Sequence, residues 1–235
     1  MTDSSIRGAF WLGVRDALPF LIVIVPFGML FGVVAAEAGW RLTETMAMSV
    51  FVIAGASQFT ALQLLTEQAP LLIVVATSLA VNLRMAMYSA SLAQHVGPVP
   101  LWQRALAAYV LTDQNYGISV NRYATRPAMT PAQKMAHFLG GAVPVCGPWY
   151  FATWAGAVAG EAIPEGLAMD FAVPITFIAL VAPALRSLPH LAAAVVSVVA
   201  SLALAWMPYN LWLLVATLLA MLAGASVETW QERRR

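Results

Sequence analysis

The stretch Ala54-Gly55-Ala56-Ser57-Gln58-Phe59 lies inside an apolar run at 46–65, and Asn82-Leu83-Arg84 lies inside another at 70–92. A cation at the centre of a bilayer costs at least ~2.5–3.5 kcal/mol on insertion scales, so it normally faces a protein interior or an aqueous cavity. Small residues let helix backbones approach closely, and a loosened helix at this depth must be buried or line a cavity. We therefore expect the two stretches to form a substrate path that the other spans enclose.

The composition indicates an integral membrane protein. Of the 235 residues, 61% are hydrophobic and 10% are charged, whereas a soluble domain carries about 25% charged residues. No linker divides the chain, so a single membrane domain is expected over residues 1–235. A lone cysteine and three scattered histidines predict no disulfide framework, no metal site and no cofactor. The net charge of +1, without a basic patch, predicts no nucleic-acid partner.

Apolar runs between polar or proline-rich connections predict an all-α polytopic integral membrane protein with about eight transmembrane helices. The run at 101–120 contains Arg104 and Asp113, and it either crosses as a shielded helix or lies at the interface. The candidate spans are 18–38, 46–65, 70–92, 101–120, 135–159, 167–185, 191–206 and 211–225.

The distribution of charge favours crossing at 101–120. If the N-terminus is cytoplasmic and the spans alternate, most basic residues lie inside, and only Arg41 and Arg104 lie outside with several glutamates. Cytoplasmic loops of membrane proteins carry an excess of Lys and Arg. This bias arises only if 101–120 crosses, and it predicts that both termini are cytoplasmic.

Arg84 lies about 20 Å along its helix from Pro70, which is too deep for the side chain to reach the interface easily. Tyr88 and Ser91 follow at spacings of four and three residues, so the three side chains share one helical face, while Asn82 points elsewhere. Arg84 either locks two helices together in an ion pair, or it receives a carboxylate substrate.

Asp113 is the expected partner of Arg84, because it lies at a similar depth. Burial raises the pKa of a carboxyl group and a nearby arginine lowers it, so Asp113 is either a proton carrier or a static counter-ion. Asp170 lies near the start of its span and is a further candidate for proton coupling.

Residues 55–58 would let a helix thin or unwind near mid-membrane. Transporters use such breaks to direct amides at a substrate carboxylate, and the alternative is close packing of small residues. The span with Gly140-Gly141, Pro144 and Gly147-Pro148 is a candidate counterpart in a second half, which leaves an inverted repeat open. No Gly-x-Ser-x-Gly, His-Glu-x-x-His or phosphate-binding loop occurs, so no enzymatic activity is predicted.

At these residues the chain resembles the AzlC/YgaZ family, the large subunits of branched-chain amino acid exporters. The specific matches are 51–59 (FVIAGASQF) and Val81-Asn82-Leu83-Arg84 followed by Tyr88 and Ser91-Leu92. Weaker matches are Leu111-Thr112-Asp113-Gln114 with Tyr116, and Asp170-Phe171 followed by Pro174 and Phe177. In the family an acid commonly follows the position of Asp113, where this chain has Gln114.

The resemblance implies a permease of the cytoplasmic (inner) membrane that exports branched-chain and other hydrophobic amino acids. It also implies a small hydrophobic AzlD/YgaH-type membrane subunit as partner. An ion gradient, such as that of protons, is the expected driving force. The alternatives are a carrier or channel for another small anionic or zwitterionic solute, and a non-transporting scaffold subunit. The residues expected to bind or translocate substrate are Gly55, Ala56, Ser57, Gln58, Phe59, Asn82, Arg84, Tyr88 and Asp113.

Overall fold

The computed structural model describes residues 5–97, 99–160, 185, 187–208 and 211–233. These residues form helices and connections, and no strand occurs in this part of the chain, as the prediction of an all-α protein requires. The chain divides into two compact units. The first contains Met1–Leu62 and Val81–Leu167, and the second contains Gln63–Ala80 and Ala168–Arg235.

The first unit is built around two long helical rods. One rod joins α1 (Ile6–Ala17), a 3₁₀ turn at Leu18–Phe20 and α2 (Leu21–Glu37). The other rod is α8 (Pro131–Gly160). At 30 residues α8 is about 45 Å long, which is enough to cross a bilayer.

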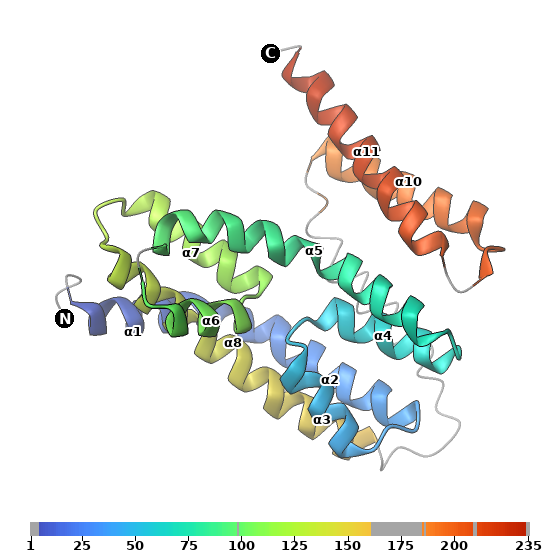
Figure 1. Cartoon of the computed structure of the whole chain (residues 1–235), viewed down its shortest axis with the longest axis horizontal. Coiled ribbons are helices and arrows are strands. Elements are labelled where there is room, and N and C mark those ends of the chain that lie inside the picture. Colours follow the sequence, from blue (N-terminus) through green and yellow to red (C-terminus); the bar gives the residue numbers. More distant parts are fainter. Residues whose placement is uncertain (1–4, 98, 161–184, 186, 209–210, 234–235) are drawn as a thin grey trace. The chain divides into compact units, whose positions relative to one another are not determined.

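Glycines hold the two rods in direct backbone contact. A Cβ atom at Gly13 would overlap the carbonyl of His137, and one at Gly32 would overlap the carbonyl of Thr153. Residue numbers therefore rise together along the interface, so the α1–α2 rod and α8 run parallel (Figure 1).

The glycines and prolines of α8 do not break the helix, contrary to expectation. A Cβ atom at Gly140 or Gly156 would overlap a carbonyl oxygen of the α1–α2 rod, so these glycines permit close packing. Pro144 and Pro148 lie inside a continuous α8. The structure therefore does not place a counterpart of the break near Gly55 within α8.

The segment 46–65 is divided by a break at 52–54 between α3 (Leu42–Phe51) and α4 (Gly55–Thr66). The side chain of Gln58 donates to Ser49 Oγ at 3.1 Å, across the break. In one continuous helix nine residues would separate these groups by about 13 Å, so the two helices must fold back on each other. Phe59 then packs against Phe27 and Phe31 of α2.

The segment 101–120 contains a second break, at 110–112, between α6 (Leu101–Tyr109) and α7 (Asp113–Thr125). The chain reaches it from α5 (Leu71–Val96), whose part from Val81 onward belongs to the first unit.

The helices α6 and α7 also fold back on each other. The side-chain amide of Asn115 donates to the Phe138 carbonyl at 3.1 Å, and the hydroxyl of Tyr123 donates to that of Lys134 at 2.7 Å. Numbers rise along α7 as they fall along α8, so α7 is antiparallel to α8. At the start of α6, Leu101 and Met135 line one cavity. Its last residue, Tyr109, has a hydroxyl 3.2 Å from that of Tyr150, so α6 is parallel to α8. The chain therefore leaves the start of α8 along α6 and returns to it along α7 (Figure 1).

The spans predicted at 46–65 and 101–120 each consist of two helices with a break between them. In the first segment a break occurs as expected, but it precedes Gly55, and 55–58 form the first turn of α4. In the second segment, Thr112 accepts the backbone N–H of Asn115 at 3.3 Å and Asp113 lies in the first turn. Such residues are favoured at helix starts, so they begin a new helix in place of continuing the old one.

Three helices among the described residues are long and apolar enough to cross a membrane: Ile6–Glu37, Leu71–Val96 and Trp212–Gln231. A shorter apolar helix covers Leu188–Leu204. The span expected at 167–185, with Asp170, lies outside the described residues except for Leu185. The count of eight spans and the single domain therefore stay predictions.

In the second unit, α10 (Leu188–Leu204) packs against α11 (Trp212–Glu232). Gly224 of α11 faces Ala193 and the carbonyl of Pro189 on α10, at the far ends of both helices from their connection, so the pair is antiparallel. The observed helices start or end within a few residues of the spans expected at 191–206 and 211–225, except that α11 continues to Glu232.

Many large apolar side chains are exposed over the described surface, including Ile22 at 81%, Leu72 at 77% and Leu202 at 75%. A soluble monomer rarely exposes extended apolar surface. This surface fits a lipid bilayer or a membrane partner.

Candidate functional site

The two helix breaks of the first unit lie next to each other. The hydroxyl of Tyr109, at the end of α6, donates to the carbonyl of Val50 in the last turn of α3 at 2.7 Å. The same hydroxyl lies 3.2 Å from that of Tyr150, near the middle of α8. Sequence reasoning did not single out Tyr109 or Tyr150. The two segments of irregular backbone therefore lie next to each other and beside α8.

The first turn of α4 contains the predicted residues 55–58. Gly55 and Ala56 are half-buried and Ser57 is buried. The N–H of Gln58 bonds the carbonyl of Ala54 at 2.9 Å, so the hydrogen-bond ladder of α4 begins there. The N-terminus of a helix carries partial positive charge and favours an anion.

Gln58 is fully buried in a chain of polar side chains. Its amide donates to Ser49, whose hydroxyl in turn lies 3.4 Å from the Thr153 hydroxyl, and all three side chains are 0% exposed. The other atom of the amide, Oε1, has no protein partner. An unpaired buried acceptor costs about 1–3 kcal/mol, so a donor supplied by water or a ligand would be bound favourably there.

Phe59 belongs to an aromatic cluster and not to a polar site. Its ring centroid is 5.1 Å from that of Phe27 and 5.4 Å from that of Phe31. Phe27 also contacts Trp149 of α8, and Gly55 lies against both Phe27 and Trp149. The cluster fixes α4 against α2 and α8 and gives the break an apolar wall.

Arg84 and Asp113 form the ion pair expected from their depth. Arg84 is on α5 and Asp113 is in the first turn of α7, directly after the second break, and the Nη2–Oδ2 distance is 3.0 Å. The side chains are 35% and 37% exposed. Arg84 Nε and Asp113 Oδ1 are buried without a protein partner. The pair therefore has one donor and one acceptor left to offer.

The face of α5 that carries Arg84, Tyr88 and Ser91, which their spacing predicts to be shared, lies against α7. The ring of Tyr88 stacks on that of Tyr116 at 4.2 Å, and Tyr116 donates to Ser91 at 2.9 Å. Tyr88 also lies close enough to Asp113 for their side chains to interact. Asn82 is half-buried, and its Oδ1 atom has no protein partner.

A second charged cluster lies near the start of α8. Arg122 makes a bidentate contact with Asp16, with distances from 2.6 to 2.9 Å, and His137 Nε2 lies 3.0 Å from Asp16 Oδ2. Sequence reasoning assigned Asp16 and Arg122 only to polar segments at span ends. Their pairing joins α1, α7 and α8, and a cavity of about 320 Å³ lies beside them.

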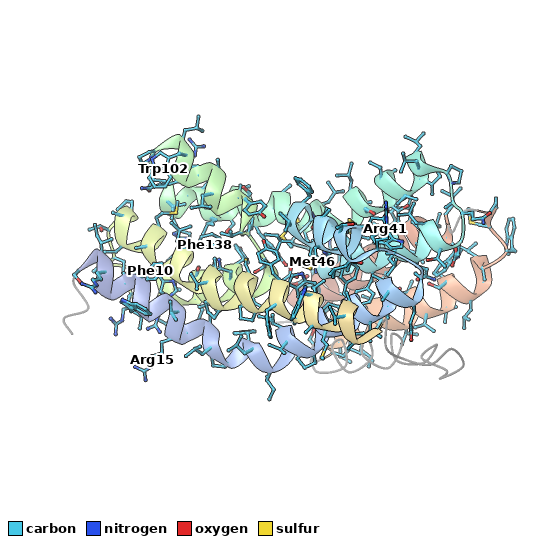
Figure 2. All side chains as sticks on the ribbon, turned by 90° about the horizontal axis from the view of Figure 1, so that it is seen from below. Phe10, Arg15, Arg41, Met46, Trp102 and Phe138 are labelled. Atoms are coloured by element: carbon cyan, nitrogen blue, oxygen red, sulfur yellow. The ribbon has the colours of Figure 1, made fainter. Side chains whose placement is uncertain are left out.

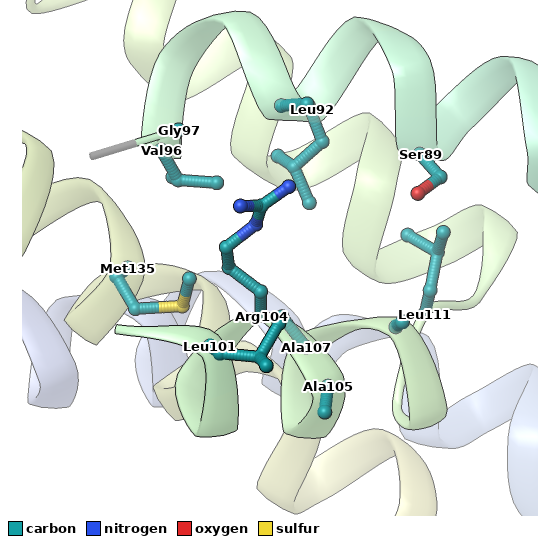
Figure 3. Close-up of a pocket in the computed structure, with 12 residues that line it drawn as sticks. Ser89, Leu92, Val96, Gly97, Leu101, Arg104, Ala105, Ala107, Leu111 and Met135 are labelled. Carbon is teal, nitrogen blue, oxygen red and sulfur yellow. The ribbon is translucent and has the colours of Figure 1, made fainter. Parts of the chain in front are cut away.

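A mostly apolar cavity of about 280 Å³ lies between α5, α6 and the start of α8. Figure 3 shows the Arg104 side chain extending from α6 toward Leu92 and Val96 of α5. The cavity continues to Ser89 and Leu111, which lies within the second break. One cation within apolar walls matches a small carboxylate with an apolar side chain.

No group of three or more His, Cys, Asp or Glu side chains suited to a metal ion occurs among the described residues. Asp170 lies outside them, so its part in proton coupling stays a prediction.

Comparison with known proteins places the chain in a family. The family model described as "AzlC protein" matches residues 19–163, which include both helix breaks and the Arg84–Asp113 pair. An uncharacterized membrane protein of Archaeoglobus fulgidus is 29% identical over 98% of this chain and 99% of that protein. The inner membrane protein YgaZ of Escherichia coli K12 is 28% identical over 72% of this chain and 70% of its own length.

An uncharacterized membrane protein of Helicobacter pylori J99 is 34% identical over 52% of this chain and 54% of its own length. The chain thus spans about half the length of the Helicobacter relatives it matches. No solved structure matches it. The family model covers well over half of the 235 residues, and the chain belongs to the AzlC family of membrane proteins.

Proposed function

We propose that this chain is the transporting subunit of an exporter of branched-chain and other hydrophobic amino acids, driven by an ion gradient such as that of protons. The observation that carries the proposal is the Arg84–Asp113 pair, located directly at a helix break and retaining one unpaired donor and one unpaired acceptor. An amino acid zwitterion needs a cationic group, an anionic group and an apolar contact. All three occur around the paired breaks.

Arg84 and the first turn of α4 would bind the substrate carboxylate, and Asp113 would bind its ammonium group. A guanidinium can bind a carboxylate with two parallel hydrogen bonds. Arg84 contacts Asp113 through Nη2, and its Nε–H has no protein acceptor. Substrate would then compete with the internal ion pair, so the pair would close the empty site. Alternatively, Asp113 would serve as the coupling proton site, and it would then not bind the ammonium group.

The apolar side chain of the substrate would pack against the aromatic cluster of Phe27, Phe59 and Trp149. Such contacts give little discrimination, since one methylene contributes only about 1–3 kcal/mol in a hydrophobic pocket. Leucine, isoleucine and valine would therefore share the site. A small AzlD/YgaH-type subunit would cover part of the exposed apolar surface.

The alternatives are a carrier for another small anionic or zwitterionic solute, and a subunit without transport activity. The ion pair favours the latter in one respect, because Arg84 and Asp113 partly satisfy each other. The unpaired atoms of Gln58, Arg84 and Asp113 favour a site that binds a ligand.

The test is efflux of preloaded labelled leucine, valine and isoleucine from cells that express this chain with and without the small subunit. Efflux that requires both chains and is abolished in Arg84→Ala supports the exporter. Full efflux from an Arg84→Ala protein that inserts normally contradicts the proposed role of Arg84. If a verified membrane complex exports none of the three, the substrate is another small solute.

A further inference from the structure

We infer that α3–α4 and α6–α7 are re-entrant hairpins that enter the bilayer from opposite faces, so that their tips meet at mid-depth as halves of an inverted repeat. This inference concerns the path of the chain through the membrane. It stands whichever solute is transported.

The first step is the direction of α5. Its end lies near the start of α8, because the ring of His95 contacts Tyr123, which in turn contacts His137. Arg84, eleven residues before His95 on α5, pairs with Asp113 at the start of α7, whereas His95 contacts Tyr123 near the end of α7. Because α5 runs with α7, and α7 is antiparallel to α8, α5 is antiparallel to α8 and to the α1–α2 rod.

The second step is a count of crossings. If the α1–α2 rod crosses from one face to the other and α5 crosses back, the segment between them cannot add a net crossing. The segment α3–α4 must therefore leave and re-enter at one face. The same holds for α6–α7, because α8 again runs opposite to α5. The side-chain bond between Gln58 and Ser49 across the first break agrees with such a reversal.

The third step is the distribution of charge. Figure 2 shows Phe10, Arg15 and Trp102 toward one end of the first unit and Arg41 toward the other. With hairpins, Arg41 is the one basic residue at the outer end of the part of this unit that the structure describes, and it is paired with Glu44 at 2.7 Å. The basic residues at the inner end are Arg7, Arg15, Arg104, Arg122, Arg126 and Lys134. This arrangement obeys the positive-inside rule better than eight crossings, which place Arg104 outside. The charge bias therefore does not require 101–120 to cross, provided that 46–65 does not cross either.

The fourth step is the equivalence of the two halves. Each consists of a long helix, a short helix, a three-residue break and a second short helix: α2–α3–α4 and α5–α6–α7. The sequences at the breaks also correspond, as Phe51-Val52-Ile53-Ala54-Gly55 and Tyr109-Val110-Leu111-Thr112-Asp113. The long helices are antiparallel, so the two halves have inverted topology, a common construction in transporters.

The hairpins explain how irregular backbone is tolerated at this depth. Non-helical backbone in a membrane must be buried in protein or line a cavity. Ala54, Leu111 and Thr112 in the breaks are buried, and Tyr109 joins the two hairpins by its bond to the Val50 carbonyl. We call the contact between the two hairpin tips the seam. One hairpin enters from each face of the membrane, so movement of either hairpin away from the seam would open the site to that face alone.

The test is the side of the membrane at which single cysteines react with an impermeant maleimide. In a Cys146→Ala background, Thr43→Cys, Gln94→Cys and Ala128→Cys place the label at exposed positions. The complete complex is labelled in right-side-out and in inverted vesicles. Eight alternating crossings put positions 43 and 94 outside and position 128 inside. Re-entrant hairpins put position 43 outside and positions 94 and 128 inside.

We expect positions 94 and 128 to react from the same side and position 43 from the opposite side. Reaction of position 94 from the side of position 43 overturns the inference. Retained complex formation by each variant ensures that the labelled chains are folded. Because this readout requires no transport, loss of the proposed exporter activity would leave it unaffected.

Discussion

Neutralising one member of the Arg84–Asp113 pair should reduce stability, and neutralising both should restore it. At the Nη2–Oδ2 distance of 3.0 Å, the Coulomb attraction has an upper bound of roughly 5–6 kcal/mol at an effective dielectric constant of 20. Each side chain is about one third exposed, so solvent screens much of this attraction. Removing one partner from a fully buried pair costs about 3–5 kcal/mol, and we expect about 2 kcal/mol here.

The measurement is a double-mutant cycle on the purified complex in one detergent, with Arg84→Gln, Asp113→Asn and the double variant. At about 2–4 °C per kcal/mol for a chain of this size, each single variant should lower the Tm by roughly 4–8 °C. The double variant leaves no lone charge, so most of the loss should be recovered. Arg15→Gln, at an exposed position, is the matched control and should change stability by less than about 0.5 kcal/mol.

Transport separates the structural role of the pair from its functional one. If Arg84 binds the substrate carboxylate, the double variant regains stability while leucine efflux stays abolished. Full recovery of efflux in the double variant would refute the reasoning, because a neutral pair could then replace the charged one. Equal Tm values for the wild type and both single variants would show that the ion pair contributes nothing.

Three further predictions concern the breaks, the central interface and the Arg104 cavity. Tyr109→Phe removes a hydrogen bond worth about 1 kcal/mol between the tips, so maleimide should label Ile53→Cys faster in that background, and an unchanged rate would contradict the seam. Gly156→Ala forces a Cβ atom into an α2 carbonyl and should destabilise the protein by roughly 1–3 kcal/mol, whereas Gly147→Ala, with open space around it, should not lower the Tm. Arg104→Gln should raise the half-saturating leucine concentration for efflux several-fold and Arg104→Lys less, while an unchanged value would separate that cavity from the substrate path.

The chain's hydrophobicity predicted the class of protein, and its few charges predicted the central contact. An arginine and an aspartate at similar depth in apolar runs have almost no other way to reduce the cost of their charges, so the sequence alone predicts that Arg84 pairs with Asp113. The exposed apolar surface and the helices confirm a helical membrane protein. The family resemblance is confirmed by the match over residues 19–163.

Glycine was a less informative predictor of helix breaks, because the absence of a side chain can serve two structural purposes. Without a Cβ atom a residue can loosen a helix, as at the break that ends at Gly55, or it can let two backbones touch, as at Gly140 and Gly156 of α8. The local sequence is similar in both cases. Only the presence of a neighbouring backbone distinguishes them, and it comes from a distant part of the chain.

The sequence by itself determined that this protein lies in a membrane, which residues bring charge into it, and that a helix break lies near 55–58. It missed the break at 110–112 and wrongly predicted one within α8. The tertiary structure decided that the chain reverses at both breaks. A sequence that favours a helix break predicts where the ladder of backbone hydrogen bonds ends, but it does not predict the angle between the two helices that flank the break. That angle is set by contacts between helices, namely Gln58 with Ser49 and Asn115 with the Phe138 carbonyl. Length and hydropathy are the same for a crossing helix and for two half-helices that return, so only those contacts distinguish the two.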